Sequence, residues 1–188
     1  MNKLKTESTY KALLDAAVVV MQEKGFEKAS VSAITKQAGV AHGTFYTYFT
    51  AKNEVIPALA ENIVQETLNK MKQRTEPHTE PAKLMQDLID VTFEMTEIYK
   101  DVITFCYAGL AFYNSFDRWE AIYAPYYQWL EEHLEGDYHN NDKMILIPMI
   151  VDVIENAADR YYIAGNKKIN QTQLKQAIFE VVMRMLPH

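Results

Sequence analysis

A nine-residue segment, "AHGTFYTYF" at 41–49, brings together the side chains best suited to specific polar recognition. It alternates aromatic rings with threonine hydroxyls and carries no formal charge with its histidine neutral. Hydroxyl groups hydrogen-bond to base edges and phosphate oxygens, and the threonine methyl contacts the methyl group of thymine. The segment is therefore typical of a short helix that lies against a polar polymer.

At 100° per residue, this helix has two distinct faces. Phe45 and Phe49 are four residues apart and share one face, which we expect to pack inward. The rest of the helix carries the polar and hydroxyl-bearing side chains of His42, Thr44, Tyr46, Thr47 and Tyr48, together with Gly43, which has no side chain. A helix that served only as core would not need this second set.

The preceding residues predict the elements that position this helix. An apolar stripe predicts a first helix over 9–24, and Gly25 stops it. Ser30 is a favourable N-cap for a second helix that Gly39 ends. Two short helices joined by a tight turn are typical of a helix-turn-helix motif. A further helix over 52–74 follows.

These residues resemble the N-terminal domain of the TetR family of bacterial transcriptional regulators. The resemblance covers about residues 8–60. It rests on Ile34, Ala38, Gly39, Val40, Gly43, Thr44, Phe45, Tyr46, Tyr48, Phe49 and Lys52. Met21 and Val55 depart from the residues common in the family, but both remain core-type side chains.

The resemblance implies roles for individual residues. His42, Thr44 and Thr47 match positions that meet bases or nearby backbone, and Ser32 matches a position that reaches the groove. Ser30, Tyr46, Tyr48 and Lys52 match phosphate-contacting positions, and Gly43 allows close approach of the backbone. It also implies a double-stranded DNA operator, a homodimer and a small-molecule effector as partners, with repression relieved by the effector as the default mechanism.

Charge is divided unevenly along the chain, whose formal net charge is −6. Residues 1–53 contain seven lysines and four acidic residues, a balance of +3, so the remainder carries −9. A basic head attracts phosphates. The single cysteine, Cys106, forms no internal disulfide, and no apolar run is long enough to span a membrane. We expect a cytoplasmic protein with no signal peptide.

Helical periodicity continues to the C-terminus and predicts an all-α fold of about nine helices. The loop "RTEPHTEPAK" at 74–83 precedes predicted helices at 82–99, 101–114, 117–135, 143–164 and 170–186. Pro125 predicts a kink or split, and Pro148 a bend or the true start of its helix. We assign residues 1–53 to a helix-turn-helix DNA-binding domain, and 54–188 to a helical ligand-binding and dimerisation domain.

The second domain is rich in aromatic residues, which predict an apolar pocket for a lipophilic or aromatic effector. The candidate lining residues are Tyr99, Phe105, Tyr107, Phe112, Tyr113, Phe116, Trp119, Tyr123 and Tyr127. In the resembling family the last two long helices form the dimer surface. The candidate interface residues are Ile147, Val151, Ile154, Ala158, Leu174, Ile178, Val181 and Met185. Both sets have an alternative interpretation as protomer core.

Two other classes of function remain as alternatives. An enzyme would need a nucleophile with its base, a metal cluster or a phosphate loop. No such motif occurs, and we expect no catalytic residues, cofactor or metal; the residues His133, Asp137, His139 and Asp142 are interpreted as a solvated loop. The other alternative is a helical small-molecule-binding or adaptor protein without DNA-binding activity.

Overall fold

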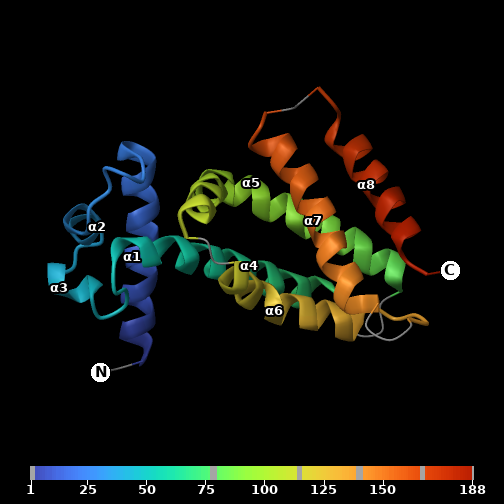
Figure 1. Ribbon diagram of the computed structural model, residues 1–188, viewed down its shortest axis with the longest axis horizontal. Helices are drawn as coiled ribbons and strands as arrows, with labels where there is room; N and C mark the ends of the chain where they lie inside the picture. Colours follow the sequence, from blue (N-terminus) through green and yellow to red (C-terminus); the bar gives the residue numbers. More distant parts are fainter. Residues whose placement is uncertain (1–2, 77–79, 114–115, 139–141, 166–167, 188) are drawn as a thin grey trace. The chain divides into compact units, whose positions relative to one another are not determined.

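The computed structural model describes residues 3–76, 80–113, 116–138, 142–165 and 168–187. For residues 3–6, 108–113 and 116 it describes the backbone but not the side chains. In this part of the chain there are eight α-helices, one short 3-10 helix and no strand (Figure 1). The all-α prediction is confirmed. The chain divides into two compact units, residues 1–60 with 104–114, and residues 61–103 with 115–188.

The first unit is built on α1 (Lys3–Lys24), α2 (Val31–Gln37) and α3 (His42–Phe45), followed by η1 (Lys52–Glu54). Leu13, Ala17 and Met21 of α1 are fully buried. Gly25 adopts φ 76° and ends α1, as its sequence context predicts. The first unit also includes Val55–Ala60, all buried, and therefore extends past the predicted domain boundary at residue 53.

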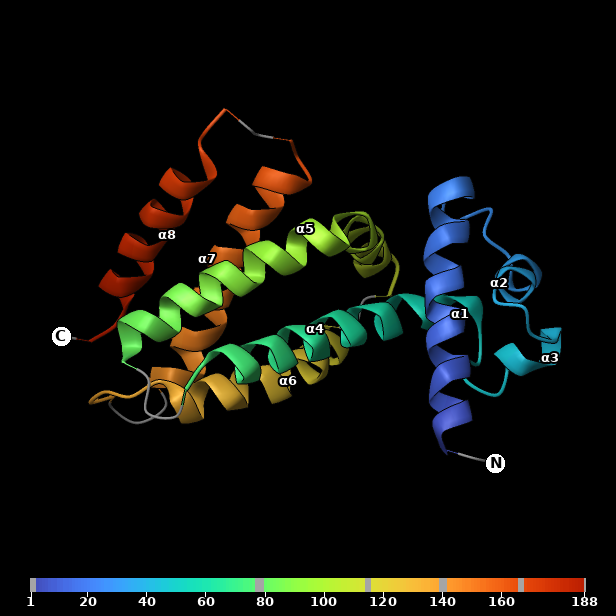
Figure 2. The same cartoon turned by 180° about the vertical axis from the view of Figure 1, so that it is seen from behind.

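The second unit contains most of α4 (Val55–Arg74) and of α5 (Pro81–Tyr113), together with α6 (Phe116–His133), α7 (Asp142–Tyr162) and α8 (Gln171–Met185). All five helices contribute to one apolar core, which includes Leu68, Phe93 and Leu130. Both views show α7 and α8 side by side (Figures 1 and 2). A segment of α5 is buried on several faces, from Leu84 to Thr96, because neighbouring helices surround it.

One predicted helix boundary is wrong. The expected break between the helices at 82–99 and 101–114 is absent, since α5 continues through Lys100 as a single helix. No glycine or proline stands there to end it. For each proline one of the two predicted alternatives is excluded: Pro125 lies inside α6 and does not split it, and Pro148 lies inside α7 rather than at its start. A kink at Pro125 and a bend at Pro148 stay predictions.

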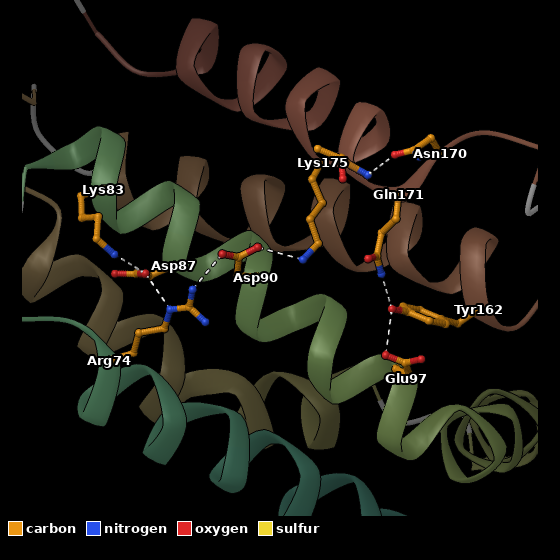
Figure 3. A network of polar contacts seen from close by, with 10 residues as sticks. Arg74, Lys83, Asp87, Asp90, Glu97, Tyr162, Asn170, Gln171 and Lys175 are labelled. Atoms are coloured by element: carbon orange, nitrogen blue, oxygen red, sulfur yellow. Dashed lines mark hydrogen bonds and ion pairs between the residues drawn. The ribbon is translucent and has the colours of Figure 1, made fainter.

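A network of ion pairs joins α4, α5 and α8 within the second unit (Figure 3). Asp87 of α5 is 1% exposed, and its Oδ1 accepts from Arg74 Nε at 2.8 Å and from Lys83 Nζ. Arg74 Nη2 also donates to Asp90, which in turn accepts from Lys175 of α8 at 2.8 Å. A buried carboxylate held by two cations fixes the C-terminal end of α4 on α5.

This burial makes a prediction about stability. Asp87→Ala leaves Arg74 and Lys83 without their shared acceptor, and we expect it to lower the free energy of unfolding by about 2 kcal/mol. The matched control is Glu94→Ala, which removes the solvent-exposed pair with Lys70 and should cost less than about 0.5 kcal/mol. Urea denaturation followed by circular dichroism measures both. Equal losses would contradict a special role for Asp87.

Candidate DNA-binding surface and effector site

The helix-turn-helix motif forms through the caps and turns that its residues predict. Ser30 Oγ accepts a hydrogen bond from the Ala33 backbone N–H at 3.2 Å and caps α2. Gly39 adopts φ 68° in the turn, a conformation that a side chain would strain. α3 itself is only four residues long, shorter than the helix predicted within the segment 41–49. Hydrogen-bonded turns extend it, with Phe49 N–H donating to Phe45 O at 3.0 Å.

The aromatic residues of this segment have the two predicted orientations. Phe45 and Phe49 are 0% and 4% exposed, with ring centroids 5.1 Å apart. Tyr10 of α1 stacks on Phe49 at 5.5 Å and contacts Tyr48 at 5.8 Å. Tyr46, in contrast, is 55% exposed. The buried pair therefore fixes the backbone while the other side chains are presented outward.

The structure places most of the predicted DNA-contacting residues on an accessible surface. Exposed members are Ser30, Ser32, His42, Gly43, Tyr46 and Thr47, while Thr44, Tyr48 and Lys52 are half-buried. The ring of His42 meets that of Tyr46 edge-on at 5.7 Å. A Cβ added at Gly43 would meet nothing within 4 Å, so the space in front of this backbone is open.

Lys52 has a structural role that the sequence did not reveal. Its Nζ donates to the backbone carbonyls of Phe26 at 2.9 Å and Glu27 at 3.3 Å, and lies 4.5 Å from the centre of the Phe26 ring. The ammonium group thereby fastens the turn after α1 to the start of η1. Phosphate contact by Lys52 stays a prediction. The ammonium group has three N–H donors, and a phosphate would use one that does not bond to these two carbonyls.

The predicted pocket residues are distributed over both units, so the structure does not test them as one site. Phe105 and Tyr107 belong to the first unit, whereas Tyr99, Trp119, Tyr123 and Tyr127 belong to the second. The side chains of Phe112, Tyr113 and Phe116 lie outside the described residues. Tyr99 is half-buried, and its hydroxyl donates to Glu66 at 2.6 Å.

A polar cluster in the second unit, formed by Tyr123, Tyr126, Tyr127 and Glu155, is only half predicted. Tyr123 and Tyr127 are among the predicted pocket residues, whereas Tyr126 and Glu155 are not. Tyr123 Oη donates to both carboxylate oxygens of Glu155, at 3.0 and 3.2 Å. Tyr126 is 1% exposed, and its hydroxyl has no hydrogen-bond partner. The missed signal is an acidic residue adjoining the apolar stripe of α7, beside Ile154 and Ala158.

Desolvation dominates the electrostatics of this cluster. It raises the pKa of the Glu155 carboxyl from an ordinary 4.5 to about 8; Asp152 and Asp159 add to the rise, while the Tyr123 hydrogen bond opposes it. Glu155 retains some accessible surface, but the protein atoms around the carboxylate govern its ionisation. Burial, with repulsion from Glu155 second, also raises the pKa of Tyr126 and of Tyr127.

A separate cavity lies among aliphatic side chains. Leu84, Leu88, Leu130, Leu134 and Ile147 are among its lining residues, and it is small and entirely apolar. Such a space has no polar group to orient a ligand. We therefore regard the tyrosine and glutamate cluster as the better candidate for effector recognition.

The predicted dimer residues need correction. Ile147, Val151, Ile154, Ala158 and Ile178 are buried in the protomer's own core and are unavailable to a partner. Helix periodicity found the strongest apolar stripe of α7, and that stripe packs against neighbouring helices of the same chain. Only Leu174, Val181 and Met185 of the predicted set retain accessible surface. Exposed apolar residues of α7 occupy other positions: Met144, Ile145, Met149 and Val153.

Comparison with known proteins decides the family. Residues 13–59 match the model described as "Bacterial regulatory proteins, tetR family", and residues 85–186 match "Tetracyclin repressor-like, C-terminal domain". The chain belongs to the TetR family. It is 41% identical over 187 residues to YvdT, an uncharacterized HTH-type transcriptional regulator of Bacillus subtilis, covering 96% of each chain. This TetR-family chain is therefore a DNA-binding transcriptional regulator.

Solved structures show the same fold. The fatty acid degradation regulator FadR of Bacillus halodurans superposes with a TM-score of 0.69 at 22% identity, covering 92% of this chain and 93% of that one. FadR of Bacillus subtilis in complex with stearoyl-CoA gives 0.62 at 19% identity, covering 95% and 100%. No helix in the described ranges of this chain is long and apolar enough to cross a membrane.

The raised pKa of Glu155 predicts how stability varies with pH. Because the folded protein holds this proton more tightly than the unfolded chain, stability present at low pH is lost as pH rises from about 4.5 to 8. We expect the wild-type free energy of unfolding to fall by about 1–3 kcal/mol between pH 5 and 8, after allowing for partial exposure. Glu155→Gln should lack this decrease.

Urea denaturation at pH 5, 6, 7 and 8 measures the difference between wild type and variant. Glu132→Gln, an exposed acid on α6, serves as the control and should keep the wild-type slope. If Glu155→Gln and wild type have parallel pH profiles, the burial of Glu155 does not govern its ionisation.

Proposed function

We propose that the protein acts as a homodimeric repressor that binds a palindromic operator and releases it when a small lipophilic or aromatic molecule binds the second unit. The observation that carries the proposal is the outward face of the segment at 42–49, where hydroxyl groups stand exposed over the buried Phe45 and Phe49. It acts by binding, in the cytoplasm, and not by catalysis.

The residue roles follow from exposure and chemistry. Thr47 is exposed and reads base edges in the major groove, with Thr44 beside it half-buried. Tyr46 and Ser30 are exposed and contact phosphates, which position the helix without selecting sequence. Ser32 of α2 is also exposed and reaches the groove. Gly43 lets the backbone approach the sugar-phosphate chain. His42, at the start of α3, lies where a recognition helix meets bases.

Dimerisation matters because one small helix-turn-helix module buries little DNA surface. Two copies about 34–36 Å apart read two half-sites one helical turn apart. We propose that the interface uses the exposed stripe Ile145, Met149 and Val153 of α7. On α8 it uses Val181 together with Leu174 and Met185, which keep accessible surface. Ile145 and Met149 are 64% and 51% exposed, and a partner would remove this apolar surface from water.

The switch requires a ligand that prefers one of two conformations of the body. A hundredfold loss of operator affinity corresponds to about 2.7 kcal/mol of coupling free energy. α4 is the covalent path for this coupling, since Val55–Ala60 belong to the first unit and Glu61–Arg74 to the second. The stearoyl-CoA complex of Bacillus subtilis FadR supports the idea that this fold accommodates a lipophilic ligand.

Fluorescence anisotropy with labelled DNA from upstream of the protein's own gene tests the function. We expect saturable binding that weakens steeply with salt. A helical ligand-binding or adaptor protein without DNA-binding activity is the second candidate. Absence of any protein-dependent change at low salt, with the folded protein intact, would establish that alternative.

Gly43→Ala separates DNA binding from folding more sharply than any polar substitution. The added methyl group meets open space, so the thermal midpoint should be unchanged or slightly higher. Operator affinity should nevertheless fall at least tenfold, because the methyl group would stand between the backbone and the DNA. The control is Thr172→Ala, an exposed position on α8 that should change neither quantity. Unaltered operator affinity in Gly43→Ala would contradict close approach at α3.

The proposed interface is tested by placing a charge on it. Met149→Glu should convert the dimer to a monomer in sedimentation velocity, since burying an unpaired carboxylate costs more than the interface gains. Ala121→Glu, at an exposed position of α6, introduces the same charge elsewhere and should leave the dimer intact. A Met149→Glu protein that still sediments as a dimer would move the interface to another face.

A further inference from the structure

Glu155 lies in the second unit with its hydrogen-bonding capacity only partly used. The Tyr123 hydroxyl is the donor that reaches its carboxylate, although an ionised carboxylate offers about four acceptor positions. Among the described residues, no lysine or arginine forms an ion pair with it. The nearby charged groups on its own helix, Asp152 and Asp159, are acidic and repel it. A desolvated carboxylate that forms no ion pair with the protein is suited to bind a cationic ligand.

Tyr126 supplies an independent observation at the same place. Its hydroxyl is fully buried and has no partner with hydrogen-bond geometry. The Thr92 side chain is close enough to lower the pKa of this hydroxyl by a weak polar contact, and Glu155 is close enough to raise it. Leaving a buried hydroxyl unpaired costs about 1–3 kcal/mol. Two polar groups with incomplete hydrogen bonding, from α6 and α7, thus occur side by side. A ligand that carries an N–H group would complete both.

Aromatic rings complete the surroundings. The Tyr123 and Tyr127 rings lie 5.4 Å apart, and Tyr126 and Tyr127 are stacked at 6.4 Å. The face of a tyrosine ring attracts a cation, most strongly where water is excluded. Glu120 of α6 adds negative potential close to Tyr127. Thr92 of α5, which influences Tyr126, is neutral, so the described groups named here as shifting the pKa values of this cluster are acidic or neutral.

From these features we infer that the effector is a lipophilic ammonium cation with at least one N–H. Its nitrogen would lie between Glu155 and the Tyr126 hydroxyl, with its apolar part against Tyr123 and Tyr127. The inference rests on the proposed function, because it names the chemical class of the effector that the second unit binds. An acyl chain with an anionic head would instead be repelled by Asp152 and Asp159, and also by Glu155 once that carboxyl is ionised.

Binding of a cation is linked to release of the Glu155 proton. With its pKa at about 8, this carboxyl is mostly protonated at pH 6, and the cation must displace that proton. Affinity for the cation should therefore rise as pH increases, by roughly 50-fold between pH 6 and pH 8. A neutral ligand of the same shape should show no such rise.

The experiment compares three probes of one shape on the full-length protein by isothermal titration calorimetry at pH 6, 7 and 8. The probes are 2-naphthylmethylamine, which stays protonated in this range, the neutral 2-naphthylmethanol and the anionic 2-naphthoate. We expect the amine to bind at least tenfold more tightly than the alcohol at pH 8, and the naphthoate more weakly than either. An alcohol or naphthoate that binds as tightly as the amine would overturn the inference.

Variants locate the site. Glu155→Gln should reduce the affinity of the amine to that of the alcohol and abolish its pH dependence, while Glu132→Gln on the exposed face of α6 should change neither. Tyr126→Phe provides a second test that does not endanger the fold, since it removes an unpaired buried hydroxyl. It should weaken the amine about three- to tenfold and leave the alcohol unaffected. Amine binding that survives both substitutions would also overturn the inference.

Operator anisotropy with each probe distinguishes failure of this inference from failure of the proposed function. Release of the operator by the naphthoate or the alcohol, but not the amine, would contradict a cationic effector while leaving the repressor intact. A protein that never binds operator DNA would instead contradict the function itself. Release by the amine alone, lost in Glu155→Gln, is the result we expect.

Discussion

The contact between Phe45 and Phe49, with Tyr10 stacked against the second ring, is the constraint on which the DNA-binding surface depends. A helix of four residues has too few hydrogen bonds to be stable alone. Burial of two aromatic rings contributes several kcal/mol and holds this turn in place. The hydrogen-bonding side chains beside them can then be short and neutral, because the scaffold and not their own contacts fixes their positions.

A similar constraint operates at the ends of the motif. Gly25 and Gly39 supply the left-handed turns, Ser30 caps α2, and Lys52 joins the turn after α1 to the residues that follow α3. Each of these interactions satisfies backbone groups that a short helix leaves unpaired. Lys52 shows that a residue at a phosphate-contacting position can also be structural. Loss of DNA binding on its substitution would therefore not by itself prove contact with DNA.

How far the sequence determined these features differs between the two units. In the first unit, local signals sufficed: glycine turns, a serine cap and an i, i+4 aromatic pair specify the motif within thirty residues. In the second unit, α7 presents apolar residues on more than one face, and periodicity cannot tell which face meets the same chain. Ile154 and Met149 are both apolar and five residues apart, yet one is in the core and the other is exposed. The buried character of Glu155 likewise depends on α6, far away in the sequence.

The ion pairs around Asp87 and the cluster around Glu155 represent opposite solutions to the burial of a carboxylate on neighbouring helices. Asp87 forms ion pairs with two cationic side chains of the same chain and is a fixed part of the fold. Glu155 has a phenol and acidic neighbours, and the protein holds it protonated at neutral pH. Because the unfolded chain would gain by ionising it, this arrangement lowers stability as pH rises. A ligand that pairs with Glu155 would recover the stability that burial of this carboxyl costs the protein. A switch needs a ligand that stabilises one of its two conformations more than the other in this way.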